Sequence, residues 1–307
     1  MRLPRPLRGV VPPTVTPLLD RDTLDAAGLE RLIGRFEAAG VSALFILGTT
    51  GEAPGLSYRL RREMIDRVCR QAADRLPVLA GVADTSLVES LRLAEYAAAR
   101  GAAALVVAPP YYFPMSQGEY LSFLERVSGA YPLPLFLYNL PRNVGFAIEP
   151  ETVRRAAELP NVVGLKDSSG DLEHLREVIR LLRGTPGFSI LNGPEQMLAE
   201  AVAMGAHGGV CGGANLYPAL YVRLYEAARD GDAEAVARLH AKVMQICDLV
   251  YAQGPEESSY LRGLKCALGL AGICAPGLAE PYVPLPAAAR EAIDEALIEI
   301  GLLSAPA

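Results

Sequence analysis

The chain has 307 residues, of which 51% are hydrophobic and 21% charged, and its net charge is −6. This composition provides for a large apolar core and argues against disorder, while an acidic chain without a basic stripe argues against a nucleic-acid surface. No apolar run approaches the ~20 residues of a membrane span and the first residues do not resemble a secretory signal, so we expect a cytoplasmic protein that binds no membrane.

Eight apolar runs recur along the chain and are predicted to be strands. Most of them lack strict alternation of apolar and polar residues, which is typical of strands covered on both faces. In chain order, the runs span residues 10–16, 43–48, 77–83, 104–109, 134–139, 162–167, 188–193 and 208–213.

Helical patterns lie between the predicted strands. Ser86 with Glu89 and Ser116 with Glu119 have the spacing of a capping box, and Asp171 can cap the helix that follows it. After the eighth strand, helices are predicted over residues 219–230, 233–253, 256–271 and 287–302.

Alternation of strand and helix predicts an α/β fold, and eight such units favour a (β/α)₈ TIM barrel. We expect the barrel, with a short N-terminal arm, to span residues 1–230 and a C-terminal helical extension to span residues 231–307. An open doubly wound sheet would need a phosphate or dinucleotide fingerprint after its first strand, and the sequence has none.

Polar residues follow the predicted strands at the point where each strand ends. Lys166 ends the sixth strand, Tyr138 lies near the end of the fifth, Tyr112 follows the fourth, and Thr49 and Thr50 follow the second. Chemistry gathers at this rim of a parallel barrel, so we expect these side chains to converge on one site.

Lys166 interrupts an otherwise apolar strand and is a candidate nucleophile. An ammonium is disfavoured in an apolar barrel, which favours a reactive neutral amine. Such an amine condenses with a ketone to an iminium, which permits cleavage of the neighbouring C–C bond. A lysine ion-paired to a carboxylate is the alternative, although Asp167 should face the other side of the strand.

The tyrosines at the rim are candidates for proton relay, because a phenol can give and take protons within hydrogen-bond reach. Ordinary packing explains any one of them at least as well. Glu195, after the seventh strand, either binds substrate hydroxyls or solvates a helix start. Gly212 and Gly213, after the eighth strand, either leave room for an elongated substrate or serve the backbone alone.

The turn Gly48-Thr49-Thr50-Gly51-Glu52 offers backbone N–H groups and two hydroxyls, which suit a carboxylate. Five cysteines without a C-x-x-C pair predict no structural disulfide, and three histidines without metal-ligand spacing predict no metal site.

Four motifs, G-T-T-G-E, P-P-Y-Y, L-Y-N-L-P and G-L-K-D-S-S-G-D, occur in this order at predicted strand ends. Together they resemble the dihydrodipicolinate synthase/N-acetylneuraminate lyase family over nearly the whole chain. The resemblance implies class I aldolase chemistry with pyruvate as the common product or substrate, a small-molecule 2-oxo acid as ligand and no cofactor beyond the lysine Schiff base. It also implies a homotetramer built from tight dimers.

The resemblance assigns a role to each matching residue of the rim. Lys166 matches the Schiff-base lysine and Tyr138 the tyrosine that shuttles protons beside it. Tyr112 matches the relay tyrosine that the neighbouring subunit of the tight dimer supplies. Thr49 and Thr50 match the pair that holds the 2-oxo acid carboxylate and links the tyrosines.

Substrate-binding positions match less closely. Gly193 and Val210 match backbone positions that line the pyruvate pocket. Asn143 stands where dihydrodipicolinate synthases have an arginine, and Arg142 is displaced by one residue. Gly212 stands where N-acetylneuraminate lyases usually have a serine.

The chain resembles 4-hydroxy-2-oxoglutarate and 2-keto-3-deoxy sugar-acid aldolases more closely, at Asn143 and in the stretches Lys166-Asp167-Ser168 and Gly208-Gly209-Val210-Cys211. We predict an aldolase that reversibly cleaves a 4-hydroxy-2-oxo acid to pyruvate and an aldehyde. Condensation of pyruvate with aspartate semialdehyde, the reaction of 4-hydroxy-tetrahydrodipicolinate synthase, is the alternative within the same chemistry. A non-catalytic barrel that binds a sugar acid is the alternative from another class.

Overall fold

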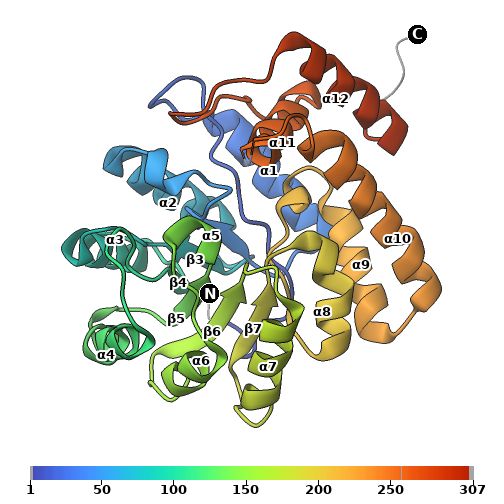
Figure 1. The fold of residues 1–307 in the computed structure, drawn as a ribbon. Helices are drawn as coiled ribbons and strands as arrows, with labels where there is room; N and C mark the ends of the chain where they lie inside the picture. Colours follow the sequence, from blue (N-terminus) through green and yellow to red (C-terminus); the bar gives the residue numbers. More distant parts are fainter. Residues whose placement is uncertain (1–2, 257, 304–307) are drawn as a thin grey trace.

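The computed structural model describes residues 3–256 and 258–303 of the chain. Eight parallel strands form one sheet in the order β1-β8-β7-β6-β5-β4-β3-β2 (Figure 1). The strands are β1 (Gly9–Val10), β2 (Leu44–Ile46), β3 (Val78–Gly81), β4 (Ala104–Val107), β5 (Leu135–Asn139), β6 (Val162–Asp167), β7 (Ser189–Asn192) and β8 (Gly208–Gly209).

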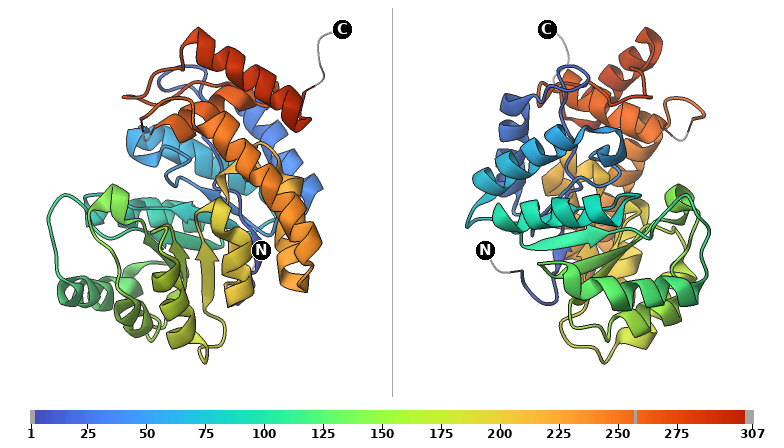
Figure 2. Two further views of the ribbon diagram at one scale, coloured as in Figure 1. Left: turned by 45° about the vertical axis from the view of Figure 1, so that its right-hand side comes forward. Right: turned by 90° about the vertical axis from the view of Figure 1, so that its left-hand side faces the viewer.

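Helices surround the sheet and continue after the last strand (Figure 2). They are α1 (Ala26–Ala39), α2 (Tyr58–Ala72), α3 (Leu87–Ala99), α4 (Gln117–Val127), α5 (Pro141–Val144), α6 (Pro150–Ala156), α7 (Leu172–Leu182), α8 (Leu198–Met204), α9 (Pro218–Asp230), α10 (Ala233–Ile246), α11 (Ser259–Leu270) and α12 (Ala287–Ile300). Within the described residues, no helix has both the length and the apolar character that crossing a bilayer requires.

Helix starts follow the predicted caps. The Ser116 hydroxyl and the Glu119 carboxylate form the complete capping box of α4, and Asp171 accepts N–H groups at the start of α7. The prediction of one continuous helix over residues 233–253 is wrong, because α10 ends at Ile246 and a π-helical turn follows over Cys247–Tyr251.

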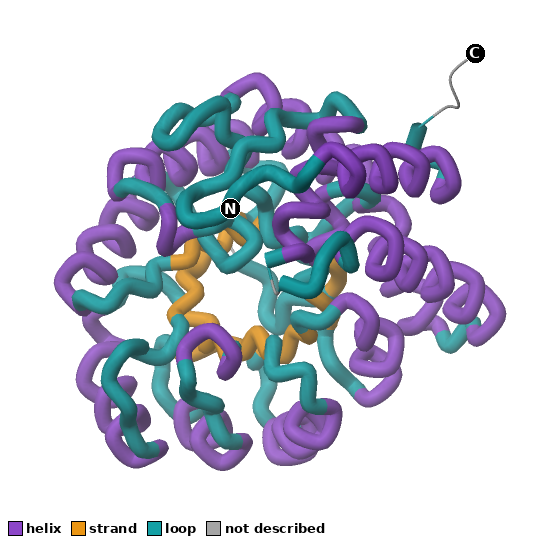
Figure 3. The backbone as a smooth tube through the Cα atoms, turned by 45° about the horizontal axis from the view of Figure 1, so that its top comes forward, coloured by secondary structure: helices purple, strands orange, loops and turns teal. Residues whose placement is uncertain are grey.

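The two ends of the sheet meet. The Ser42 N–H donates to the Val10 carbonyl at 2.9 Å and the Phe45 N–H to the Pro12 carbonyl at 3.0 Å, while Thr14 N–H donates back to Phe45 at 2.8 Å. The strands therefore form a ring inside the helices (Figure 3). β1 is shorter than predicted because the prolines at positions 12 and 13 have no N–H to donate. The α/β TIM-barrel-like fold is confirmed.

Alternation along each strand divides the core into two layers. One set of side chains fills the barrel interior, as Val106 and Phe136 do, while the other packs between sheet and helices, as Leu105 and Leu135 do. Strands covered on both faces read as apolar runs for this reason.

Candidate active site

The rim at the ends of the strands holds a cavity of about 420 Å³. Its walls come from several segments that are distant in sequence, which the barrel brings together. Among the lining residues are Thr49, Glu52, Tyr138, Asn143, Tyr260 and Glu280.

Lys166 points into the barrel because its Cα pairs with that of Tyr138 across β5 and β6. Its side chain is 6% exposed, and Nζ donates a hydrogen bond of 2.8 Å to Tyr138 Oη. Nζ also lies 4.8 Å from the ring centroid of Phe45 and 3.9 Å from that of Tyr138. The amine thus contacts the hydroxyl of Tyr138 and two aromatic rings. Among the described residues no carboxylate forms an ion pair with it, so the alternative of a structural lysine–carboxylate pair is not observed.

Tyr138 links the lysine to the Thr49 turn. Its hydroxyl lies 3.2 Å from Thr49 Oγ1 and also accepts from Lys166. Burial alone would raise the pKa of Tyr138, but the charge and hydrogen bond of Lys166, with hydrogen bonds from Thr49 and Ser168, hold it below its ordinary value. A phenol with a lowered pKa ionises more readily, and its phenolate can then accept a proton.

Asp167 faces away from Lys166, as alternation predicts. Its carboxylate accepts from Asn139 Nδ2 at 2.9 Å and from the Ser169 N–H at 3.0 Å. His174 of α7 places Nδ1 2.9 Å from Asp167 Oδ2 and Nε2 2.7 Å from the Ile148 carbonyl. Both ring nitrogens face acceptors, so the geometry calls for an imidazolium with both N–H groups donating.

Tyr112 is placed differently from the other rim residues. It is 85% exposed, has a positive φ of 89°, and packs its ring edge-on against Phe113 at 5.1 Å. Within one chain the Tyr112 ring lies at the surface against Phe113, whereas Lys166 is buried and bonded to Tyr138. Its relay role from a neighbouring subunit stays a prediction.

Gly193, Val210 and Asn143 are the remaining predicted substrate-binding residues. Gly193 donates its N–H to the Asp167 carbonyl at 2.7 Å, and a Cβ there would collide with Ser168 Oγ. Val210 is buried in the barrel interior with Tyr138, whereas Asn143 lines the cavity. Gly193 and Val210, like Lys166 and Thr50, are not among the residues that line the cavity, so their role toward pyruvate stays a prediction.

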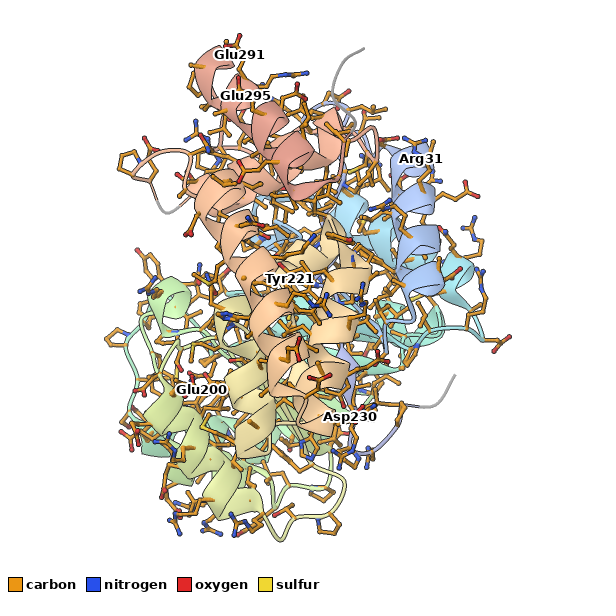
Figure 4. The ribbon with its side chains drawn as sticks, turned by 90° about the vertical axis from the view of Figure 1, so that its right-hand side faces the viewer. Arg31, Glu200, Tyr221, Asp230, Glu291 and Glu295 are labelled. Atoms are coloured by element: carbon orange, nitrogen blue, oxygen red, sulfur yellow. The ribbon has the colours of Figure 1, made fainter. Side chains whose placement is uncertain are left out.

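Neither interpretation of Glu195 is correct. The carboxylate is 5% exposed and accepts from the Gly213 N–H at 2.7 Å, the Tyr221 hydroxyl at 2.6 Å and the Tyr251 hydroxyl at 3.1 Å. Tyr221 is fully buried, whereas Asp230 at the end of the same helix and Glu200 on α8 are exposed; Figure 4 labels the three residues. Burial raises the pKa of Glu195, although these hydrogen bonds oppose the rise. Glu195 is therefore the centre of a buried polar cluster.

The glycines after β8 do not leave room for substrate. A Cβ on Gly212 would overlap the hydroxyl of Tyr260, and one on Gly213 would overlap those of Tyr221 and Tyr251. Tyr260 comes from α11 and places its Oη 3.0 Å from Thr50 Oγ1. The absence of side chains at the strand end thus makes space for tyrosines from the C-terminal helices.

A buried ion pair fixes the same turn from α11. Lys265 Nζ donates to Glu52 Oε2 at 2.5 Å and to the Thr16 carbonyl at 2.9 Å, and Glu52 Oε1 accepts the Ala279 N–H at 2.7 Å. Glu52 has a left-handed backbone with φ of 56°. Sequence reasoning missed Tyr260 and Lys265 because they lie in a helical pattern about 210 residues from the turn that they contact.

We predict that Gly212→Ala destabilises the protein because the added methyl collides with the Tyr260 hydroxyl. The expected loss is about 2 kcal/mol, typical of overpacking in a core. In a Tyr260→Ala background the same change should cost less than about 0.5 kcal/mol, since the space is then free. Urea unfolding of the wild type, the two single variants and the double variant measures the coupling between positions 212 and 260.

Gly34→Ala in α1 is the matched control, because a Cβ there meets no atom within 4 Å. It should be neutral or stabilising by up to ~1 kcal/mol. Equal costs of Gly212→Ala in both backgrounds would contradict the packing of Tyr260 against this glycine.

The Asp167–His174 pair predicts a pH-dependent contribution to stability. Although burial opposes the charged forms, the pairing lowers the pKa of Asp167 from 3.8 and raises the pKa of His174 from 6.5. The contribution of His174 is complete below its unfolded pKa and is lost as pH rises through the folded one. That of Asp167 is complete above its unfolded pKa and is lost as pH falls through the folded one.

We therefore expect the difference in unfolding free energy between wild type and His174→Gln to be largest near pH 5 and to shrink toward pH 9. Chemical unfolding at several pH values measures this difference. A difference that grows with pH above 7 would contradict the imidazolium.

Comparison with known proteins shows the family of the chain. Residues 6–300 match the model of the dihydrodipicolinate synthetase family. The chain is 32% identical over 298 residues to the 4-hydroxy-tetrahydrodipicolinate synthase of Leptothrix cholodnii, covering 97% of this chain and 99% of that protein. It is 34% identical over 300 residues to a DapA-like lyase of Halobacterium salinarum, covering 98% and 96%.

Solved structures of related proteins have the same fold. Dihydrodipicolinate synthase from Bacteroides thetaiotaomicron superposes with a TM-score of 0.94 at 52% identity, covering 97% of this chain and 100% of that one. YagE of E. coli K12, a member of the same family solved with pyruvate, has a TM-score of 0.90 at 29% identity, covering 96% and 99%. The chain therefore belongs to the dihydrodipicolinate synthetase family and is a lyase of the class I aldolase type.

Proposed function

We propose that the protein is a Schiff-base-forming pyruvate aldolase that reversibly cleaves a 4-hydroxy-2-oxo acid to pyruvate and an aldehyde. The observation that carries this proposal is the buried Lys166 amine held 2.8 Å from the hydroxyl of Tyr138. An amine beside a proton-transfer group is what carbinolamine formation and iminium chemistry require.

In the proposed cycle, the neutral Lys166 amine attacks C2 of the substrate, and loss of water leaves an iminium. Tyr138 gives the proton with which the carbinolamine hydroxyl leaves as water, and the resulting phenolate then takes the proton of the C4 hydroxyl. The C3–C4 bond breaks, its electron pair enters the iminium as an enamine, and the aldehyde leaves. Protonation of C3 and hydrolysis then release pyruvate and return the amine. No metal or organic cofactor is needed, because the iminium itself is the electron sink.

The turn that carries Thr49 and Thr50 is the proposed site of the 2-oxo acid carboxylate. Its threonine hydroxyls bond the two tyrosines of the site, at 3.2 Å to Tyr138 and 3.0 Å to Tyr260. Backbone N–H groups of such a turn suit an anion. A carboxylate bound there would present the neighbouring keto carbon to Lys166.

The aldehyde end of the substrate is proposed to face Asn143. Asn143 lines the cavity, while Arg142 is exposed and is not among the lining residues. A neutral amide at this wall favours hydroxyl groups over a second carboxylate as the recognised part of the substrate. This supports a 2-keto-3-deoxy sugar acid, whose distal end carries hydroxyls, over aspartate semialdehyde. The distal end of 4-hydroxy-2-oxoglutarate carries a carboxylate, so Asn143 does not favour it in the same way.

A second candidate is the condensation of pyruvate with aspartate semialdehyde. It is supported by the names of the relatives, since both the Leptothrix protein and the Bacteroides structure are named as synthases of this kind. The non-catalytic sugar-acid barrel is set aside, because the chain belongs to a family of lyases and keeps the lysine, tyrosine and threonines of the site.

We also propose that a neighbouring copy of the chain completes the site with Tyr112, in a homotetramer built from tight dimers. The exposed ring pair of Tyr112 and Phe113, at 85% and 76% exposure, supports an apolar contact there. The division into a barrel over 1–230 and a helical extension over 231–307, and a cytoplasmic location, belong to the same proposal.

We predict that borohydride reduction in the presence of pyruvate adds one pyruvyl group to Lys166. The chain has only three lysines, at positions 166, 242 and 265, so intact mass and peptide mapping identify the labelled one. Lys265 is 1% exposed and paired with Glu52, and it should stay unlabelled. Lys166→Met should abolish the adduct. An adduct on another lysine, or none on the wild type, would overturn the aldolase mechanism.

Substrate class needs a comparison of rates. We expect kcat/KM for cleavage of 2-keto-3-deoxygluconate or 4-hydroxy-2-oxoglutarate, followed by pyruvate release, to exceed that for condensation of pyruvate with aspartate semialdehyde by at least about tenfold. Asn143→Arg is the informative variant, because a guanidinium should improve use of a carboxylate-bearing aldehyde. A wild type that strongly prefers aspartate semialdehyde would establish the second candidate instead.

A further inference from the structure

Tyr260 forms a second pair of hydrogen-bonded hydroxyls, with Thr50, next to the hydrogen-bonded series Lys166–Tyr138–Thr49. The residue lies at the start of α11 and lines the cavity, and its hydroxyl lies 3.0 Å from Oγ1 of Thr50, a buried residue next to the lining residue Thr49 in the chain. Thr49 and Thr50 are adjacent, so one turn serves both series. No motif at the strand ends points to this tyrosine.

The position of Tyr260 is fixed from three sides. Its ring packs edge-on against Tyr251, with ring centroids 4.8 Å apart and an interplanar angle of 78°. Its hydroxyl fills the space beside Gly212, where any side chain would collide with it. Lys265 of the same helix is bonded to Glu52, so α11 is attached at two points to the turn that bears Thr50.

The bond between Tyr260 and Thr50 leaves one O–H group free. Each hydroxyl has one proton, and one of the two protons is used between them. Burial, together with the nearby charge of Glu195, raises the pKa of Tyr260, so the phenol stays protonated. The pair can therefore donate one hydrogen bond to an acceptor in the cavity, and an anionic oxygen is the strongest acceptor for it.

We propose that Tyr260 is a positioning residue that fixes the Thr50 hydroxyl as a donor to the carboxylate of the bound 2-oxo acid. The proposal rests on the proposed function, because it takes the Thr49–Thr50 turn as the carboxylate site. Tyr260 acts on binding rather than on proton transfer, since its bonded partner is Thr50 while the Lys166 amine is bonded to Tyr138.

The test uses Tyr260→Phe, which keeps the ring and removes the hydroxyl. The pyruvate concentration that half-saturates borohydride trapping of Lys166 should rise about tenfold, because the Thr50 hydroxyl is no longer held in place as a donor to the carboxylate. Trapping of acetone, which has the ketone but no carboxylate, should be unchanged. For the full reaction, KM should rise while kcat stays within about twofold.

Tyr120→Phe is the matched control, because Tyr120 is a buried tyrosine of α4 whose hydroxyl has no hydrogen-bond partner among the described residues. It should leave both trapping reactions unchanged. Equal weakening of pyruvate and acetone trapping by Tyr260→Phe would mean a merely structural role and overturn the proposal. A fall in kcat at unchanged half-saturation would mean proton transfer and overturn it too.

Thr50→Val gives a second route to the same conclusion. Because Tyr260 acts through Thr50, this variant should shift half-saturation at least as far, and the double variant should go no further than Thr50→Val alone. Independent, multiplying effects would contradict the proposal. Failure of the wild type to trap pyruvate at all would instead refute the proposed function, so the two failures are distinguishable.

Discussion

The hydrogen bond between Lys166 and Tyr138 is the interaction on which the proposed chemistry depends. The two residues pair across neighbouring parallel strands, so their side chains point together into the barrel. The register of β5 against β6 also sends Asn139 and Asp167 together to the outer face, where they bond each other. A slip of one residue would exchange the two faces. The barrel thus fixes the amine and the phenol by backbone pairing, before any loop contributes.

The polar groups behind the site are each satisfied by partners from distant segments. Glu52 is neutralised by Lys265, Glu195 is bonded by two tyrosines and a backbone N–H, and Asp167 is bonded by His174. Leaving any of them unpaired in the interior would cost several kcal/mol. The clusters of Glu52 and Glu195 join the barrel rim to segments that follow α9, through Lys265 and Tyr251 respectively. These C-terminal segments therefore contribute to the geometry of the cavity.

Sequence reasoning identified the parts of the molecule that follow from local pattern. Apolar runs indicated the strands, and the caps at Ser116 and Asp171 indicated helix starts. The break of an apolar strand at Lys166 indicated a buried amine, which the structure places beside Tyr138. Sequence reasoning could not identify Tyr260 or Lys265, whose partners lie about 210 residues away, and it misread Glu195 and Gly212. The errors at Glu195 and Gly212 have one cause. The space beside these strand ends is filled by tyrosines from segments distant in sequence, and only the tertiary fold places them there.

A crystal structure of the protein soaked with pyruvate tests the central claim most directly. The account predicts a covalent bond from Lys166 Nζ to C2 of pyruvate, with the carboxylate on the Thr49–Thr50 turn and Tyr138 Oη beside the new iminium. Pyruvate bound elsewhere, with the Lys166 amine still free and bonded to Tyr138, would contradict it.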